Sequence, residues 1–196
     1  QTAVWLFACW SAGLVARPVG PDVTPDVEAD IEVDIAVVAE ELLPVPAVAA
    51  RDVVGLSLHA LGRPLADPPA GVVDYAVEVR SYGDHFVPYT PVDPDGPALD
   101  VANDTFTAAE LVRLAHDAAR EWGLDARTRV LADMPYITVN MLLSGLLAPL
   151  SANGSVIIQR NLDESSLERR ITLEHVTAVA GVPGWDERTG PVRRLL

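Results

Sequence analysis

The chain has 196 residues, 49% of them hydrophobic and 21% charged, and its formal net charge at pH 7 is −14. Its 14 basic residues are all arginine, which excludes a Schiff base, an ammonium group on a phosphate and acid–base catalysis by lysine. The acidic charge repels phosphate backbones and anionic lipids, so neither nucleic acid nor a membrane surface is an expected partner. The single cysteine, Cys9, excludes a disulfide within the chain and a cysteine-built zinc cluster.

An uncharged stretch opens the chain. Residues 2–13 (TAVWLFACWSAG) predict a buried helix that ends at Gly13, and residues 14–19 predict a short strand. Residues 2–16 are too short to span a membrane, which takes about 20 residues. They also lack the basic start of a signal peptide, so we expect a cytoplasmic protein. Because the first residue is Gln rather than Met, we expect that residues upstream of Gln1 are missing.

Charged and apolar residues alternate strictly over residues 26–35. In an extended chain the five carboxylates of this stretch share one face at spacings of about 7 Å. Residues 18–50 contain no basic partner, and like charges in line repel. We therefore favour a solvated strand edge or loop, protected from sheet-to-sheet pairing by its charges, over a cation site. Residues 34–39 and 52–61 predict further strands or strand–helix pieces.

Seven prolines interrupt residues 62–100. Each proline lacks a backbone donor and restrains the residue before it. Residues 74–83 (DYAVEVRSYG) predict a short element, and residues 85–97 (HFVPYTPVDPDGP) predict a loop.

The second half alternates helical and strand patterns. Thr107 followed by Glu110 is a capping-box pattern, an apolar stripe at helical spacing follows it, and Gly123 is placed to end this helix. The remaining predicted elements are strands at 129–133, 155–158 and 176–181, a helix at 138–148 stopped by Pro149, and a helix capped by Asp163.

Alternating helices and strands with short connections predict parallel βαβ units. The expected fold class is α/β, with a parallel (mixed) sheet flanked by helices. We expect a first α/β lobe over 1–100, including the proline-rich loop 62–100, and a βαβ-type second lobe over 101–196, the two sharing one compact unit.

The order of motifs in the second half is that of a known superfamily. The matching text is RVLADMPYITVNMLLSGLLAPLSANGSVIIQ followed by LERRITLEHVTAVAGVP, and the opening FACWSAGLVARPVG matches a segment near that superfamily's start. From Thr107 to Pro183 the chain resembles the N-terminal domain of the AMP-binding (adenylate-forming, acyl-CoA synthetase-like) enzymes. More narrowly, the whole chain resembles a short actinobacterial family of uncharacterised AMP-binding-like proteins.

The chain departs from this superfamily where ATP would bind. The superfamily's phosphate loop, rich in Thr, Ser and Gly and ending in Lys-Gly, should precede Thr107. Residues 81–104 stand there instead, with isolated glycines, several prolines and five aspartates. Converging backbone N–H groups are what such a loop offers an anion, and prolines and carboxylates oppose this. The proline–hydrophobic–histidine stretch also lacks its histidine, and we expect the C-terminal lobe with its catalytic lysine to be missing after Leu196.

Five residues are candidate ligand contacts: Tyr82, Asp84, His85, Pro135 and Tyr136. The resemblance places the first three in the loop facing the nucleotide site and the last two at the carboxyl end of a strand, where open α/β sheets bind ligands. An Asp beside a His can orient an imidazole or contribute to a metal site. We favour a loop that merely caps the sheet, and we expect neither a metal site nor a cofactor.

The other histidines and serines are given structural roles. His59, His116 and His175 are scattered without metal-ligand spacing, and Ser144-Gly145 lies in an apolar helix where small residues mark close packing. The arginine pairs 169–170 and 193–194 predict a solvated face, with an acidic partner as the alternative.

Two functional hypotheses follow. The favoured one is a degenerate adenylate-forming domain, catalytically inactive, that serves as a binding or interaction module with a protein partner or a second copy. The alternative is a subunit that binds a small acyl or nucleotide ligand, or an acyl-CoA synthetase-like enzyme that needs a partner chain. No catalytic residue is assigned.

Overall fold

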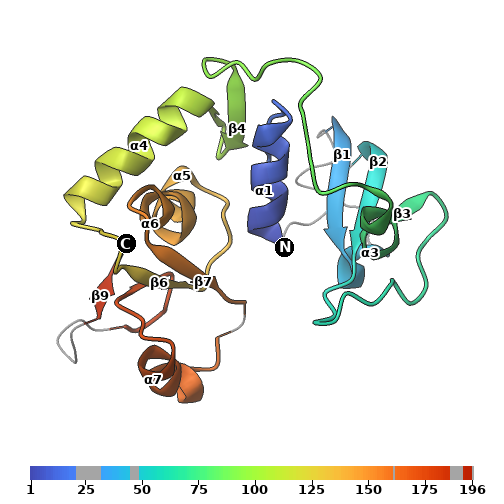
Figure 1. Cartoon of the computed structure of the whole chain (residues 1–196). Helices are drawn as coiled ribbons and strands as arrows, with labels where there is room; N and C mark the ends of the chain where they lie inside the picture. Colours follow the sequence, from blue (N-terminus) through green and yellow to red (C-terminus); the bar gives the residue numbers. More distant parts are fainter. Residues whose placement is uncertain (21–31, 45–48, 161, 186–191, 196) are drawn as a thin grey trace. The chain divides into compact units, whose positions relative to one another are not determined.

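The computed structural model describes residues 1–20, 32–44, 49–160, 162–185 and 192–195 (Figure 1). The chain divides into two compact units. The larger unit comprises residues 1–20 and 88–196, and the smaller unit comprises residues 21–87. Parallel sheets flanked by helices occur as the sequence predicts, so the expected α/β class is confirmed.

The smaller unit is built on a three-stranded parallel sheet with strand order β1-β2-β3. A short helical turn, η1, lies in the connection that returns the chain from β1 to the parallel β2, and α3 and η2 follow the last strand of the sheet. Its elements are β1 (Glu32–Ala39), η1 (Glu40–Leu42), β2 (Ala49–Leu56), β3 (Val72–Asp74), α3 (Tyr75–Glu78) and η2 (Val79–Ser81).

The acidic stretch of the sequence lies partly on β1. Glu32 and Asp34 are exposed there, and among the described strands β1 pairs with β2 alone, so the prediction of a solvated strand edge is confirmed for these two residues. Asp34 pairs with Arg51 of the neighbouring strand at 3.0 Å. Asp26, Glu28 and Asp30 lie outside the described residues.

The larger unit contains a four-stranded parallel sheet with strand order β7-β6-β8-β9, together with an antiparallel β4–β5 hairpin. Its helices are α1 (Thr2–Ser11), α4 (Ala108–Glu121), α5 (Val139–Leu142), the π-helical turn η3 (Leu143–Leu147), α6 (Ala148–Ser151) and α7 (Glu164–Leu173). Its strands are β4 (Pro97–Val101), β5 (Asp104–Thr107), β6 (Arg129–Ala132), β7 (Ser155–Ile158), β8 (Ala178–Ala180) and β9 (Arg193–Arg194).

Side chains alternate across the four-stranded sheet. Leu131 and Val179 are fully buried on the face that packs against α7 through Leu167. Val130 and Ala178 are fully buried on the other face. Figure 1 shows α7 on one side of β6 and β7 and the α5–α6 helices on the other. Burial on both faces explains why the central strands read as continuous apolar runs in the sequence.

The sheet continues beyond the last strand that the sequence predicts. The segment 176–181 supplies β8, and β9 then pairs beside it through Arg193 N–H donating to Thr177 O and Leu195 N–H donating to Val179 O. Two residues of strand are too few to give a sequence pattern.

The first 20 residues belong to the larger unit. Trp10 Nε1 donates to Ala98 O at 2.8 Å, and Ala16 exchanges backbone hydrogen bonds with Ala98 and Asp100. The expected strand at 14–19 is therefore only a single bridge, between Ala16 and Leu99. This grouping differs from the expected lobes 1–100 and 101–196, because Leu6 and Ala16 share a core cluster with Leu111 and Leu142.

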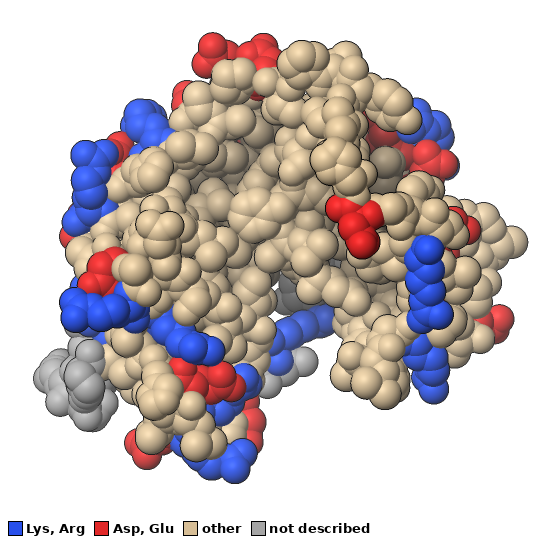
Figure 2. Space-filling model, viewed as in Figure 1, with Lys and Arg blue, Asp and Glu red and all other residues tan. Residues whose placement is uncertain are grey.

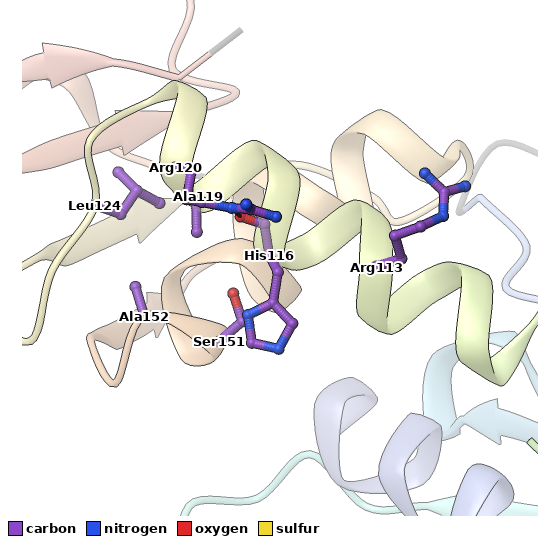
Figure 3. A pocket seen from close by; sticks show the side chains of 7 residues that line it. All are labelled: Arg113, His116, Ala119, Arg120, Leu124, Ser151 and Ala152. Carbon is purple, nitrogen blue, oxygen red and sulfur yellow. Dashed lines mark hydrogen bonds between the residues drawn. The ribbon is translucent and has the colours of Figure 1, made fainter.

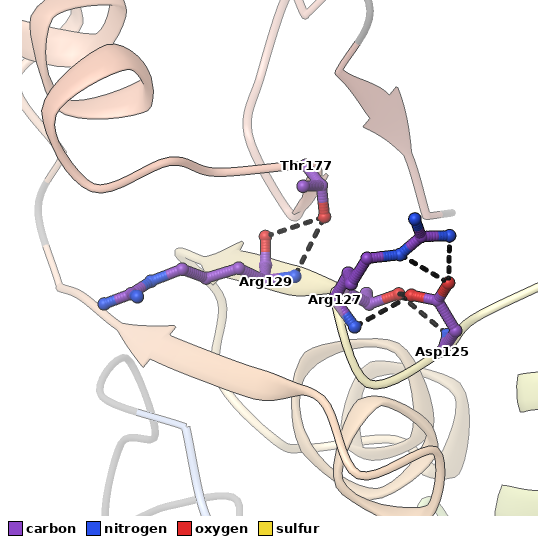
Figure 4. Close-up of polar contacts among 5 residues, drawn as sticks. Asp125, Arg127, Arg129 and Thr177 are labelled. Atoms are coloured by element: carbon purple, nitrogen blue, oxygen red, sulfur yellow. Dashed lines mark hydrogen bonds and ion pairs between the residues drawn. The ribbon is translucent and has the colours of Figure 1, made fainter.

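The polar contacts in Figure 4 fix the amino ends of β6 and β8. Asp125 accepts from Arg127 through its backbone N–H at 2.9 Å and its guanidinium at 3.0 Å. Thr177 Oγ1 accepts from Arg129 N–H at 2.8 Å. These side chains satisfy backbone donors at this end of the strands.

Helix α4 begins with the expected capping box. Thr107 Oγ1 accepts from Glu110 N–H at 3.1 Å, and the Glu110 carboxylate accepts from Thr107 N–H at 2.8 Å. These hydrogen bonds hold the pKa of Glu110 below its usual range. Gly123 has φ +58° directly after the helix, as the predicted stop requires.

The prediction that Pro149 ends its helix is wrong. The helix passes through Pro149 as α5, η3 and α6, and Ala148 N–H donates to Leu143 O, five residues back. A proline inside an α-helix cannot donate to the carbonyl four residues earlier, and its ring clashes with that carbonyl. The wider π-helical turn makes room for the ring, so the helix continues.

The Tyr136 hydroxyl donates to a carbonyl oxygen that Pro149, which has no N–H, cannot donate to. Counting four residues back from Pro149 gives Gly145, and the Tyr136 hydroxyl donates to Gly145 O at 3.2 Å. A Cβ on Gly145 would lie 2.9 Å from Tyr136 Cε1, so the close approach requires glycine. Tyr136 is 4% exposed, and burial raises its pKa to about 12.

We expect Thr107→Ala to lower the free energy of unfolding by about 1 kcal/mol, because the Glu110 N–H loses its acceptor at the start of α4. Urea unfolding measures the change. The control is Thr105→Ala on the preceding strand, which is outside the cap. An equal loss in both variants would contradict the role given to the capping box.

We expect the stability of the protein to fall between pH 10 and pH 12 partly because of Tyr136. The unfolded tyrosine ionises near pH 10 and the buried one near 12, so its contribution is complete below pH 10 and is lost as the pH rises through 12. Tyr136→Phe should cost about 1–3 kcal/mol at pH 8, because Gly145 O loses this donor. Urea unfolding at pH 8 and pH 11 should show a smaller loss in the variant than in the wild type. Identical pH dependence would contradict this assignment.

Candidate functional site

A hollow of about 280 Å³ lies in the larger unit at the carboxyl ends of β6 and β8. Open α/β sheets bind ligands at this edge, where loops leave the strands and helix amino ends arrive. The chain after β6 and the residue directly after β8 both reach it. The lining residues are Met134, Thr138, Asn140, Met141, Ser144 and Gly181.

Backbone geometry fixes the floor of this hollow. Gly181 has φ +69°, and a Cβ there would lie 2.6 Å from Met134 Cβ and 2.8 Å from Asp133 O. Only glycine permits both the left-handed backbone and this close approach. Asp133 holds the strand ends together, since its N–H donates to Ala180 O at 3.0 Å and its carboxylate accepts from Leu162 N–H at 2.9 Å.

The hydroxyl groups of the hollow are already engaged. Thr138 Oγ1 accepts from Met141 N–H at 3.2 Å and caps α5. Ser144 is fully buried, and its Oγ lies 3.4 Å from Met141 O and 3.9 Å from Met134 Sδ. Close packing is therefore the role of Ser144, as the sequence predicts. Asn140 is exposed at the rim and adds an amide.

The lining holds no titratable side chain. Two methionines supply an adaptable apolar wall, and threonine, serine and asparagine supply neutral polar atoms. This set can select a ligand by shape and hydrogen bonding. It offers no general acid, general base or activated nucleophile of its own.

The five candidate contact residues fall into two separate groups. Tyr82, Asp84 and His85 are exposed residues of the smaller unit. Pro135 is exposed and follows Met134 in the larger unit, whereas Tyr136 is buried and directs its hydroxyl to Gly145 O. A ligand contact by any of the five stays a prediction.

The sequence also held a signal for the residues that do line the hollow. Met134 precedes the Pro135-Tyr136 pair, Thr138 follows it by two residues, and Gly181 opens the Gly-Val-Pro motif. Asn140 and Met141 give no such signal, because they lie within a helix whose start the cap alone reveals.

The stretch before α4 uses backbone donors on itself. Asp93 accepts from Asp95 N–H at 3.0 Å through its carboxylate and from Gly96 N–H at 3.1 Å through its carbonyl. Ala109 N–H donates to Pro94 O at 2.8 Å. These amides close a turn lined with carboxylates, which is unlike the convergent amides of a phosphate site.

The charged side chains of the described residues do not form a metal site. Within the described ranges no three His, Cys, Asp or Glu side chains stand close enough to hold a metal ion. Basic and acidic side chains are interspersed on the face that Figure 2 shows. None of the described helices combines the length and apolar character that crossing a bilayer takes.

No family model matches the chain. Its fold is that of solved ligases: a protein assigned as a long-chain-fatty-acid CoA ligase from Rhodopseudomonas palustris matches 93% of the chain with a TM-score of 0.75 and 14% identity. MatB from the same organism matches 93% with a TM-score of 0.68 and 15% identity. The chain spans only 48% and 37% of these two proteins, respectively, and likeness at such identity concerns the fold alone.

A relative from Mycobacterium tuberculosis (strain H37Rv) is much more similar in sequence. It is a TIGR03089 family protein, 36% identical over 182 residues, and the match covers 91% of this chain and 69% of the relative. The chain has the fold of adenylate-forming enzyme domains. Because of its similarity to this relative, it belongs to the TIGR03089 family.

Proposed function

We propose that the chain is a binding module of the adenylate-forming fold, which holds a small ligand with an apolar body and does not itself join that ligand to AMP. The observation that carries this proposal is the hollow at the carboxyl ends of β6 and β8, whose lining contains no titratable side chain.

The hollow suits a small acyl group or carboxylic acid. Its volume of about 280 Å³ is near the lower end of ligand sites, which run from roughly 300 to 1,000 Å³. Met134 and Met141 can pack along an aliphatic chain, and the Asn140 amide at the rim can donate to a carboxylate or carbonyl oxygen.

Three features of the residues present support a lack of ATP chemistry. The chain has no lysine to neutralise phosphate charge. The stretch before α4 folds its amides into a turn bearing Asp93 and Asp95. Tyr136, within the segment where the superfamily carries histidine, is committed to the helix interior through Gly145 O.

The second candidate is a ligase-like enzyme completed by another chain. It is favoured by the coverage of the fold, since 93% of this chain superposes on a CoA ligase while covering 48% of it. A protein partner or a second copy would then supply the nucleotide-handling groups. The cytoplasmic location and actinobacterial origin also stay predictions, the latter supported by the relative from Mycobacterium tuberculosis.

We expect short and medium-chain carboxylic acids or their CoA thioesters to raise the melting temperature, while ATP and AMP leave it unchanged. A ligand that binds only the folded state adds RT ln(1 + [L]/Kd), which gives an increase of about 5–10 °C at 100 times Kd. Thermal-shift titration of the wild-type chain measures this. A comparable increase with ATP or an acyl-adenylate analogue would contradict the proposal, and so would the absence of any increase with acids and thioesters.

We expect Met141→Trp to abolish the stabilisation by acids, because the larger ring fills the hollow. The matched control is Leu150→Trp, a substitution on the exposed part of the neighbouring helix α6, outside the lining. The control should keep the wild-type response. If both variants keep it, the ligand binds elsewhere and the assignment of the hollow is wrong.

A further inference from the structure

A second concavity lies in the larger unit, between α4 and α6 (Figure 3). It measures about 420 Å³, and its residues are separate from those of the hollow at the strand ends. Arg113, His116 and Arg120 line it from α4. We call it the α4–α6 groove.

Helical spacing brings these three side chains onto one face. Residues three and four apart are neighbours on a helix, so positions 113, 116 and 120 form a single row. The opposite face of α4 is buried through Leu111 and Ala115, which prevents the helix from rotating the row away from the groove.

Two guanidinium groups converge at the rim of the groove. Arg120 Nη2 lies 2.6 Å from Asp117 Oδ1, and Arg113 Nη1 lies 3.5 Å from Asp117 Oδ2. One carboxylate thus pairs with both arginines, and Arg120 Nε also donates to His116 O at 3.3 Å. Most of their N–H donors stay available, since each guanidinium carries five. Counting Asp117, the cluster keeps one net positive charge in a chain whose formal charge is −14.

The floor of the groove is apolar and its width is fixed. Ala119, Leu124 and Ala152 form the floor. Ser151 Oγ lies 3.2 Å from Ala115 O and 2.9 Å from Ala148 O, so it ties α6 to α4. A hydrophobic floor beside forked donors matches a molecule with an anionic head and an apolar body.

We propose that the α4–α6 groove binds a small amphipathic organic anion. Arg113 and Arg120 hold its phosphate or carboxylate head, and its aliphatic body covers the floor formed by Ala119, Leu124 and Ala152. Asp117 positions the two arginines and at the same time competes with the ligand for their donors. This site does not depend on the hollow at the strand ends.

Calorimetric titration at low ionic strength tests the groove with hexyl phosphate, hexanoate, inorganic phosphate and hexylammonium. We expect one or both hexyl anions to bind, inorganic phosphate to bind more weakly and hexylammonium not to bind. Arg113→Gln and Arg120→Gln should each weaken the anion about tenfold, the loss of one charge-assisted contact. Asp117→Asn should tighten it several-fold, because the competing charge is removed while an oxygen that can orient the arginines remains.

The control is Arg127→Gln, which removes the same charge and an ion pair of the same kind, with Asp125, at a site outside the groove. It should leave binding unchanged. All the substituted side chains are exposed, and melting temperatures confirm that each variant folds. The proposal is overturned if no hexyl anion binds, if inorganic phosphate binds as tightly, if the control weakens binding as much as Arg113→Gln, or if Asp117→Asn weakens it.

Discussion

The hydrogen bond from the Tyr136 hydroxyl to Gly145 O links the segment after β6 to the helix that contains Pro149. It compensates for the donor that Pro149 lacks, inside a helix that continues past this proline through a π-helical turn. Because Tyr136 follows β6 and Gly145 lies in the helix after it, the bond also fixes the path of the connecting segment. That segment carries Met134 and Thr138, so the same bond shapes the hollow at the strand ends.

The hollow and the α4–α6 groove lie in the same unit but differ in the chemistry of their lining residues. At the carboxyl ends of the strands, Gly181 permits a close approach that leaves a neutral, methionine-lined space. Beside the helices, the contact of Ser151 Oγ with Ala115 O joins α6 to α4, and the arginines lie at a space with an apolar floor. Neither contains the converging amides and lysine that activation of a substrate by ATP needs, which is why binding is the function that we propose for both.

Local patterns in the sequence predicted much of the fold, and long-range contacts account for most of what they missed. The capping box at Thr107, the stop at Gly123 and the apolar strands depend on residues that are close in the sequence, and these predictions are confirmed.

The continuation of the helix through Pro149 depends on Tyr136, which no local rule connects with it. The packing of the first helix with the second half depends on Trp10 and Ala98, 88 positions apart. The five candidate ligand contacts stay predictions, and none of them lines the hollow, whose Asn140 and Met141 are brought to the rim by their position on the helix alone. The sequence shows Arg113 and Arg120 seven residues apart, which places them on one face of a helix. That both pair with Asp117 depends on their rotamers, which the sequence does not give.

The pairing of a mid-helix proline with a distant phenol makes the residues at positions 149 and 136 depend on each other. A lineage that replaces Pro149 by a residue with a backbone N–H regains an ordinary helical turn, and Tyr136 is then free to drift. A lineage that loses Tyr136 first inherits a carbonyl without this donor in a fully packed interior. Substitutions at the two positions should therefore occur in a preferred order, with the proline yielding before the tyrosine.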